Sequence, residues 1–229
     1  MNRNITSKLP ASGLALGLVA LIAFSAPAKA QTAGTWSVAS GAGWVVPRFD
    51  NGTLAGGALR NHVGNDIKPT LTIEYFIFNN VGIQLLAAIP FSQKVDLNGQ
   101  YFGEVQHLPP ALYLQYHLGG MLSQLSPSLK NISPFVGVGV EHSFIYDEKI
   151  GNQALLAALG LPANSEFAVS GSTGYTFHAG VDYVIAQSNA LRFDLYYIEI
   201  NSSVQLNGAS LGTSHIDPYV YDISYVWNF

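Results

Sequence analysis

Histidine and serine side chains are the groups in this 229-residue chain that could do metal or nucleophilic chemistry. The six histidines show no HxH or HExxH spacing, and His107 and His117 are ten residues apart, too distant to share one metal ion. His142 and Ser143 are adjacent, but adjacent strand residues point to opposite faces, and no GxSxG motif is present. We therefore predict no catalytic residue, no metal site and no cofactor, and expect the histidines to form structural hydrogen bonds.

Composition limits the class of protein that must position these side chains. Charged residues make up only 10% of the chain, whereas soluble domains usually contain roughly 25%. The formal net charge of −4 and the lack of a Lys/Arg cluster argue against a nucleic-acid partner. After residue 30, no run approaches the ~20 consecutive apolar residues that a membrane-spanning helix needs. Low charge without such a run predicts strands that each have one apolar face.

The first 30 residues have the features of a secretory signal peptide. Arg3 and Lys8 precede an apolar run from Leu14 to Phe24, and Ala28-Lys29-Ala30 supplies a small-x-small cleavage site. A spanning helix is the competing interpretation, but the run is too short and has the wrong flanking residues. We predict cleavage of residues 1–30, which leaves residues 31–229 as one domain.

Segments of alternating apolar and polar residues recur through residues 31–229, and we count eight of them. Each is at least as long as the roughly 9 to 11 residues that a tilted strand needs to cross a membrane. The pattern predicts an all-β fold, an eight-stranded antiparallel up-and-down transmembrane β-barrel. The predicted strands cover residues 35–49, 67–78, 81–97, 104–118, 134–147, 173–185, 190–206 and 214–229.

The last predicted strand indicates which membrane this is. Every second residue from Phe229 back to Tyr219 is aromatic or apolar, which is typical of the strand that closes an outer-membrane barrel. We expect Phe229 to engage the barrel-assembly machinery, and lipid and lipopolysaccharide to surround the barrel. A soluble lipocalin-like barrel is the alternative, but its charged residues would face outward. Here the ionisable residues share strand faces with glycines and small polar residues.

The connections between the predicted strands alternate in length. Asn79-Asn80 and Ala186 to Asn189 are tight turns, which we assign to the periplasm together with both termini. The opposite, extracellular side carries longer loops, and a short helix is predicted at 153–161 within the longest of them. Residues 119–133 are too long for a minimal periplasmic turn. The predicted extracellular loops cover residues 50–66, 98–103, 148–172 and 207–213.

Strand phase assigns side chains to the lipid or to the lumen. In the third predicted strand, the odd-numbered residues from Val81 to Phe91 are expected to face lipid. The lumen of an eight-stranded barrel is nearly filled by side chains, so Arg192 is expected to pair with inward-facing acids. We interpret these charges as a polar plug, with an ion pathway as the alternative. The predicted plug consists of Glu74, Glu141, Asp182, Arg192, Asp194 and Asp222.

Prolines interrupt several predicted strands. A proline has no N–H to donate to a ladder and is confined to strand edges, starts or bulges. Reflection about the extracellular loops places Pro47 near Pro69, and Pro90 near Pro109 and Pro110. A closed barrel cannot leave free backbone facing lipid, so each break must be covered or must serve as an opening. The alternative is that the strands merely bend or end as they leave the membrane.

Several motifs, in order along the chain, resemble the outer-membrane protein W (OmpW) family, which includes the AlkL-type barrels. The motifs are VGIQLLAAIPF at 81–91, VQHLPP at 105–110, PFVGVG at 134–139, GVDYVI at 180–185 and DPYV at 217–220. The resemblance implies a monomeric barrel that takes up small hydrophobic molecules through an apolar funnel. It also implies that the molecules leave sideways through the wall, at an opening formed by Pro90, Pro109 and Pro110.

The resemblance also identifies a candidate pathway. It implies a constriction at Leu86 and Tyr196, and Tyr196 stands where some relatives have tryptophan. With the strand phase it suggests that Phe76 and Tyr113 join these two residues along the approach. A second function, from another class, is a closed barrel whose loop 148–172 binds a partner without transport. A continuous apolar lining that reaches the proline break favours transport, whereas a polar lumen with an intact wall favours the closed receptor.

Overall fold

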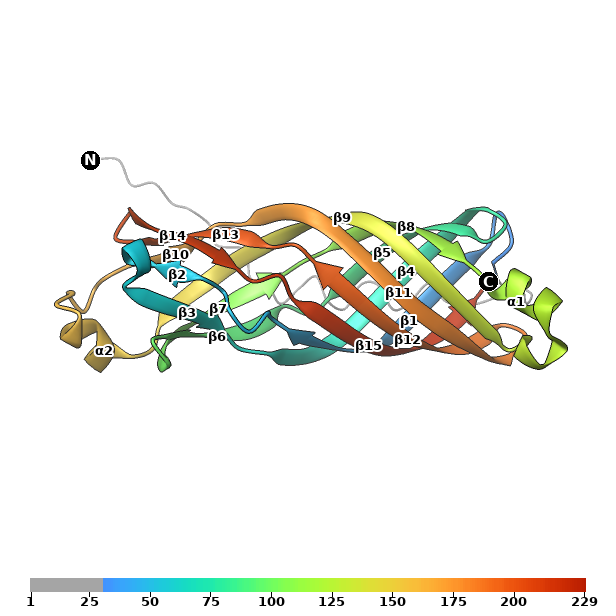
Figure 1. The fold of residues 1–229 in the computed structure, drawn as a ribbon, viewed down its shortest axis with the longest axis horizontal. Coiled ribbons are helices and arrows are strands. Elements are labelled where there is room, and N and C mark those ends of the chain that lie inside the picture. Colours follow the sequence, from blue (N-terminus) through green and yellow to red (C-terminus); the bar gives the residue numbers. More distant parts are fainter. Residues whose placement is uncertain (1–30) are drawn as a thin grey trace, which may run out of the picture.

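A computed structural model describes residues 31–229, which form a closed antiparallel β-barrel (Figure 1). The predicted signal peptide lies outside the described residues. Eight strands pair around the barrel in the order β1, β4, β5, β8, β9, β11, β12, β15, and β15 pairs again with β1. This confirms the predicted eight-stranded antiparallel barrel. The strands are β1 (Trp36–Val46), β4 (Asp66–Phe78), β5 (Val81–Ala88), β8 (Ala111–His117), β9 (Ile132–Ile150), β11 (Ser172–Ala186), β12 (Asn189–Ile198) and β15 (Tyr219–Asn228).

The outer surface of the barrel is apolar and carries aromatic residues at two levels. Trp36 and Tyr75 are 49% and 37% exposed, and their ring centroids are 4.7 Å apart. Trp44 and Tyr221, further along the same wall, are 5.7 Å apart. The two tryptophans of β1 are eight positions apart, which at the usual rise and tilt gives about 20 Å. That height suits the apolar band and flanking aromatic girdles of an outer-membrane barrel.

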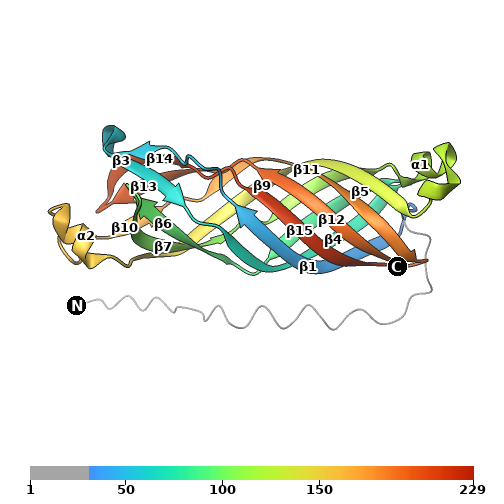
Figure 2. The ribbon, with the colours of Figure 1, turned by 60° about the horizontal axis from the view of Figure 1, so that its bottom comes forward.

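One end of the barrel is closed by short connections, as predicted. Residues 79–80 join β4 to β5, and residues 187–188 join β11 to β12. The longer connection before β9 contains α1 (Gly119–Leu125) and η3 (Pro127–Leu129). Figure 2 shows α1 and the end of β15 together at this end of the molecule, which we call the α1 end. Among residues 31–229, no helix is long and apolar enough to cross a membrane.

The opposite end, called the α2 end, extends the barrel wall well beyond the end of β1 (Figures 1 and 2). The upper half of β9 leaves β8 and pairs with β7, which continues the sheet through β6, β3 and β2, while β10, β13 and β14 form a second small sheet. The added elements are β2 (Thr53–Leu54), η2 (Ala55–Gly57), β3 (Leu59–Val63), β6 (Phe91–Leu97), β7 (Gln100–Leu108), α2 (Gln153–Ala158), β10 (Phe167–Val169), β13 (Asn201–Leu206) and β14 (Ala209–His215).

This extension corrects part of the sequence prediction. Residues 50–66 were expected to be a loop, but they contain β2, η2 and β3, because β3 adds to the edge of β6. Four predicted strands are each broken into two: 81–97, 104–118, 190–206 and 214–229. Prolines lie at three of these breaks and remove ladder N–H groups there. The break between β12 and β13 has no proline, and its short gap lies where β13 leaves the barrel sheet for the second sheet.

Candidate functional site

A layer of buried charges fills the barrel near the α1 end, and Arg192 lies at its centre. Its side chain is 1% exposed; Nε and Nη2 donate to the two carboxylate oxygens of Asp182 at 2.7 and 2.9 Å. Nη1 donates to the Gln84 carbonyl at 3.1 Å, and the guanidinium lies 4.5 Å from the centre of the Phe135 ring. A bidentate ion pair of this kind fixes the orientation of both side chains as well as pairing their charges. Arg192 therefore pairs with an inward-facing acid.

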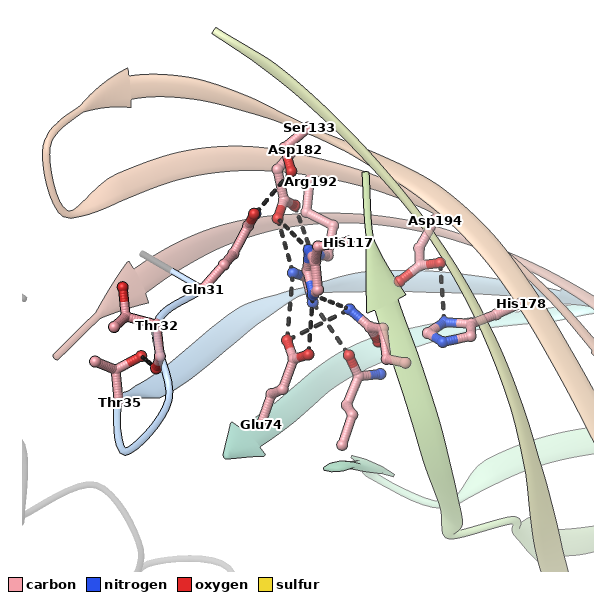
Figure 3. Close-up of polar contacts among 12 residues, drawn as sticks. Gln31, Thr32, Thr35, Glu74, His117, Ser133, His178, Asp182, Arg192 and Asp194 are labelled. Carbon is pink, nitrogen blue, oxygen red and sulfur yellow. Dashed lines mark hydrogen bonds and ion pairs between the residues drawn. The ribbon is translucent and has the colours of Figure 1, made fainter. Parts of the chain in front are cut away.

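Glu74 extends this layer across the lumen. Its Oε2 lies 3.7 Å from Arg192 Nη2, and its Oε1 lies 2.9 Å from His117 Nε2 (Figure 3). The second ring nitrogen of His117 lies 4.0 Å from Asp182. Gly82 makes room for this packing, because a Cβ there would collide with the Glu74 side chain. The layer, which we call the polar floor, spans the lumen from β4 through β8 to β11 and β12.

The upper side of the polar floor is formed by aromatic rings with polar tips. The Tyr196 hydroxyl donates to Asp194 Oδ2 at 2.7 Å, and His178 Nδ1 lies 3.3 Å from Asp194 Oδ1. The His178 ring stacks on Tyr196 with centroids 5.0 Å apart. The Tyr113 hydroxyl shares a hydrogen bond of 2.7 Å with Thr176. Tyr196 and His178 therefore direct their polar atoms to Asp194, whereas Tyr113 directs its hydroxyl to Thr176 on β11.

The other two predicted plug residues lie higher than the ion pairs. Asp222 accepts a short hydrogen bond from Thr70 and borders the lower cavity described below. Glu141 is buried but bonds to Ser143 rather than to Arg192. The structure therefore brings Glu74, Asp182 and Arg192 into one ion-paired cluster. Asp194 and Asp222 are register partners on β12 and β15 next to this cluster, and Glu141 lies apart from it.

Above the rings, the interior is lined by apolar side chains. A small cavity of about 20 Å³ lies directly against the wall break and is bordered by Leu86, Phe91, Pro109 and Tyr196, as well as by Asp222. The predicted constriction residues Leu86 and Tyr196 thus border one cavity. The surrounding buried cluster, here called the apolar chamber, consists of Val45, Val63, Leu86, Phe91, Ala111, Tyr113, Tyr196, Ile198, Ile200, Ile216 and Val220.

Phe76 does not belong to this chamber, contrary to expectation. It is 1% exposed, but its ring lies 5.2 Å from the His117 ring, within the polar floor. Phe76 pairs with Gly82 almost at the end of the β4–β5 hairpin. Strand phase gave its inward direction but not its height along the barrel, so the structure does not bring Phe76 together with Leu86, Tyr113 and Tyr196.

The apolar lining continues toward the α2 end. A second cavity of about 20 Å³ is lined by Val63 and Ile216, which also belong to the apolar chamber, and by residues of the extension such as Val95, Val105 and Ile145. Beyond it, a further apolar cluster closes the end of the molecule. That cluster contains Leu54, Leu97, Phe102, Leu156 and Val204. The interior is therefore lined mainly by apolar groups from the α2 end down to the rings above the polar floor.

Sequence reasoning missed the part of this lining that lies in β6. Phe91 was expected to face lipid, but it is 2% exposed and faces the interior, as do Gln93 and Val95. The inward phase slips by one residue between β5 and β6, and such a slip moves every following side chain to the other face. A separate analysis of the alternation in 91–97 could have found it.

The barrel wall is interrupted where the prolines lie. Pairing between β5 and β8 ends at Leu86 and Ala111, and pairing between β6 and β7 begins at Phe91 and His107. Within the described chain, residues 87–90 and 108–110 form no ladder with each other. The flanking contacts persist, because the Ile89 N–H donates to Pro69 O at 3.3 Å and the His142 N–H donates to Pro110 O at 3.2 Å. The break is therefore confined to one strand interface.

The outer side of this break is a shallow depression facing the lipid. It has a volume of about 260 Å³ and is lined by apolar residues such as Leu85, Pro110, Leu112 and Val140. The inner side of the break borders the lower cavity through Pro109. The interior cavity and the lipid-facing depression thus lie on the two sides of the same proline segment.

The prediction of a second break at Pro47 and Pro69 is wrong. Pro69 lies inside β4 and is paired with Ala42, whereas Pro47 follows the end of β1. Proline can occupy a strand where its missing N–H is not required by the ladder. Pro69 therefore leaves the β1–β4 wall intact.

A serine and a histidine do meet inside the barrel, although sequence reasoning did not pair them. His107 Nε2 lies 3.0 Å from Ser143 Oγ, and Ser143 Oγ donates to Glu141 Oε2 at 2.7 Å. The serine lies between the other two, so the acid does not orient the histidine as a catalytic triad requires. The contact depends on the β7–β9 register, which no hairpin turn specifies. No group of three or more His, Cys, Asp or Glu side chains within residues 31–229 could hold a metal ion.

Comparison with known proteins shows which family has this architecture. The sequence profile of the OmpW family matches residues 32–229. Outer membrane protein W of Vibrio cholerae is 27% identical over 223 residues, which cover 93% of this chain and 97% of that protein. The crystal structure of OprG from Pseudomonas aeruginosa superposes with a TM-score of 0.70 at 22% identity, covering 87% of this chain and 97% of OprG. The solid-state NMR structure of AlkL in lipid bilayers has a TM-score of 0.63 at 22% identity and covers 100% and 97% of the two chains.

Proposed function

The chain belongs to the OmpW family, and from this premise we propose that it lets small hydrophobic molecules cross the outer membrane passively. It is a Gram-negative outer-membrane β-barrel and not an enzyme. In the proposed route, a molecule enters at the α2 end, descends through the apolar chamber and leaves sideways between β5 and β8. We assign the α2 end to the cell exterior and the α1 end, with both termini, to the periplasm, because short turns of such barrels are periplasmic.

The observation that carries this proposal is the meeting of an apolar interior with a wall break. The chamber residue Leu86 is the last β5 residue paired with β8, and Pro109 borders the lower cavity. An apolar solute gains about 25 cal/mol for each Å² that it removes from water. An interior lined by apolar side chains would therefore let the solute pass the charged lipopolysaccharide surface. The wall break would then let it enter the lipid.

The polar floor explains why the exit would be sideways. Passage straight through the barrel would require an apolar molecule to displace Arg192 from Asp182 and Glu74, which are almost completely buried. Separation of a buried ion pair leaves uncompensated charge and costs several kcal/mol. The lateral break requires no such separation, because residues 87–90 and 108–110 share no ladder hydrogen bonds with each other.

The alternative function was a closed barrel whose extracellular segment 148–172 binds a partner. That function predicts an intact wall and a polar lumen throughout. The apolar chamber and the unpaired segment at Pro109 and Pro110 do not favour it. We therefore keep transport as the proposed function, with the barrel acting as a monomer among outer-membrane lipids and lipopolysaccharide.

The proposal is tested by placing a charge in the chamber. We expect Leu86→Arg to abolish barrel-dependent uptake of octane, because a buried guanidinium, even one paired with Asp222 across the lower cavity, would block the route and attract water. The matched control is Leu86→Met, which conserves volume and polarity and is expected to retain uptake. Uptake is measured in cells that contain equal amounts of each folded barrel. Equal octane uptake by the arginine and methionine variants would contradict the proposed route.

A further inference from the structure

The apolar lining contains two buried polar side chains that the proposed function does not use. Gln93 on β6 is 0% exposed and His107 on β7 is 1% exposed. Across residues 31–229, neither polar atom of the Gln93 amide has a hydrogen-bond partner, and Nδ1 of His107 has none either. Buried polar groups normally have partners, because a group taken from water without one is destabilising. Partnerless atoms also occur beside the ion pairs of the polar floor, on His117, His178 and Asp194, but Gln93 and His107 lie among the apolar side chains above them.

Gln93 and His107 lie between the two cavities. Along β6, Gln93 is flanked on the same face by Phe91, which borders the lower cavity, and by Val95, which borders the upper one. Along the facing strand, His107 is flanked in the same way by Pro109 below and Val105 above. Both polar residues therefore lie between the two cavities, beside the proposed route.

The two side chains are close enough to act on one group. Gln93 pairs with Val105, and His107 pairs with Phe91, so the two are diagonal neighbours on the inner face of the β6–β7 pair. Diagonal neighbours are separated by about 7 to 8 Å, within reach of long side chains. One small polar group placed between them could bond to both.

Neighbouring contacts determine what His107 offers. Ser143 donates its single hydroxyl proton to Glu141 Oε2. The hydrogen bond between Ser143 and His107 Nε2 must therefore be donated by the histidine. A neutral imidazole that carries its proton on Nε2 has a bare Nδ1. His107 thus presents an acceptor to the interior, and Gln93 presents both a donor and an acceptor.

From this geometry we propose that Gln93 and His107 form a hydrogen-bonding station for the hydroxyl end of an amphiphilic passenger, such as a medium-chain alcohol. A hydroxyl can donate to His107 Nδ1 and accept from Gln93 Nε2 at the same time, while its alkyl chain lies among the cavity residues. A carboxylate fits less well, because it offers no donor and Glu141 is linked to His107 by two hydrogen bonds through Ser143. The inference rests on the proposed function and adds a preferred substrate class.

The first test compares two probes that differ by one hydroxyl, octane and 1-octanol, and measures the barrel-dependent uptake of each. We expect Gln93→Leu to reduce 1-octanol uptake relative to octane by about three- to tenfold, the range expected for one lost hydrogen bond. This variant removes buried polar atoms without partners, so the barrel should still fold. Gln205→Leu, the same change at an exposed position of β13, is the matched control and should leave the ratio unchanged.

The second test observes the histidine directly. With ¹⁵N-labelled protein in lipid nanodiscs, the Nδ1 resonance of His107 should move upfield when 1-octanol is added and should stay in place with octane. His107→Phe should lower the 1-octanol to octane uptake ratio in the same direction as Gln93→Leu.

The outcomes separate the two proposals. If the unaltered barrel accelerates neither probe, both the proposed function and the hydroxyl station are overturned. If it accelerates both probes but the ratio is the same in the Gln93→Leu, His107→Phe and unaltered barrels, only the station is overturned, and water alone would then occupy it. A ratio lowered by both variants, with octane uptake retained, supports the station.

Discussion

At the scale of single residues, the ion-paired charges of the barrel interior lie below most of its apolar surface. Arg192, Asp182 and Glu74 lie near the α1 end, and the apolar chamber begins directly above the rings of Tyr113 and Tyr196. Tyrosine suits this boundary, because its ring is apolar and its hydroxyl bonds downward to a polar partner. The hydroxyl of Tyr196 does this through Asp194. A phenol at the constriction therefore keeps the chamber side apolar.

The first prediction concerns the ion pair at the centre of the floor. Arg192→Met should destabilise the barrel by about 3 to 5 kcal/mol, because it leaves the buried Asp182 carboxylate without its partner. Unfolding by urea in lipid vesicles measures the change. The double variant Arg192→Met with Asp182→Asn should recover a large part of the loss, since no buried charge then remains at either position. Equal stability of the single variant and the parent would show that the pair does not hold the floor together.

Residue faces could be predicted from the sequence wherever a strand is regular. In β12, alternation correctly separated buried Arg192, Asp194 and Tyr196 from exposed Leu191 and Phe193, because period two is a direct property of an extended backbone. The height of a residue along the barrel could not be predicted in this way. Phe76 was therefore placed on the correct face but in the wrong layer.

Contacts between strands that are distant in the sequence were also beyond prediction. The His107–Ser143 hydrogen bond depends on the register of β7 against β9, whose residues are joined through β8, α1 and η3. No turn type fixes that register. Sequence reasoning dismissed His142 as a partner of Ser143 correctly, but it could not identify His107.

At the scale of elements, prolines turn one hairpin into two stacked hairpins. β5 and β8 form the lower one and β6 and β7 the upper one, with a shift of one residue in register between them. The position of the break was predictable, because Pro90, Pro109 and Pro110 each lack a ladder donor. The shift was not, because proline shows where pairing stops and not the register in which it resumes.

The second prediction tests the break by closing it. The chain contains no cysteine, so Ala87→Cys with Pro110→Cys introduces a single pair, which faces across the gap if the β5–β8 register is continued by one step. Oxidation to the disulfide should reduce barrel-dependent octane uptake to near the level of cells without the barrel. Reduction should restore it.

The control for this prediction is a disulfide where the wall is already paired. Leu85 and Leu112 are register partners on the lipid-facing side, so Leu85→Cys with Leu112→Cys should form a bridge without changing uptake. Unchanged uptake by the oxidised 87–110 barrel, with the bridge verified by mass spectrometry, would show that solutes do not leave through this break.

At the scale of the whole molecule, the extension at the α2 end encloses the upper half of the proposed route. Its apolar clusters join the chamber to the outer tip, where α2 packs over β7. Asn152 anchors this helix: its side chain accepts from the Leu155 N–H at 2.9 Å and donates to Tyr101 O at 2.9 Å. Leu156, 1% exposed, fills the centre of the outermost cluster. We therefore expect a solute that enters from this end to displace the α2 contacts first.

The third prediction follows from that arrangement. Leu156→Ala should loosen α2, because it removes a buried side chain from a small cluster at the end of the molecule. Hydrogen exchange of residues 153–159 should accelerate, while the thermal unfolding midpoint of the barrel stays within a few degrees, since terminal elements open independently of a stable core. Octane uptake should rise, because a looser helix would obstruct the entrance at the α2 end less often. Leu159→Ala, which changes a 41% exposed leucine at the end of the same helix, should alter neither exchange nor uptake. A fall in octane uptake with Leu156→Ala would mean that α2 forms part of the apolar entrance at the α2 end instead of covering it.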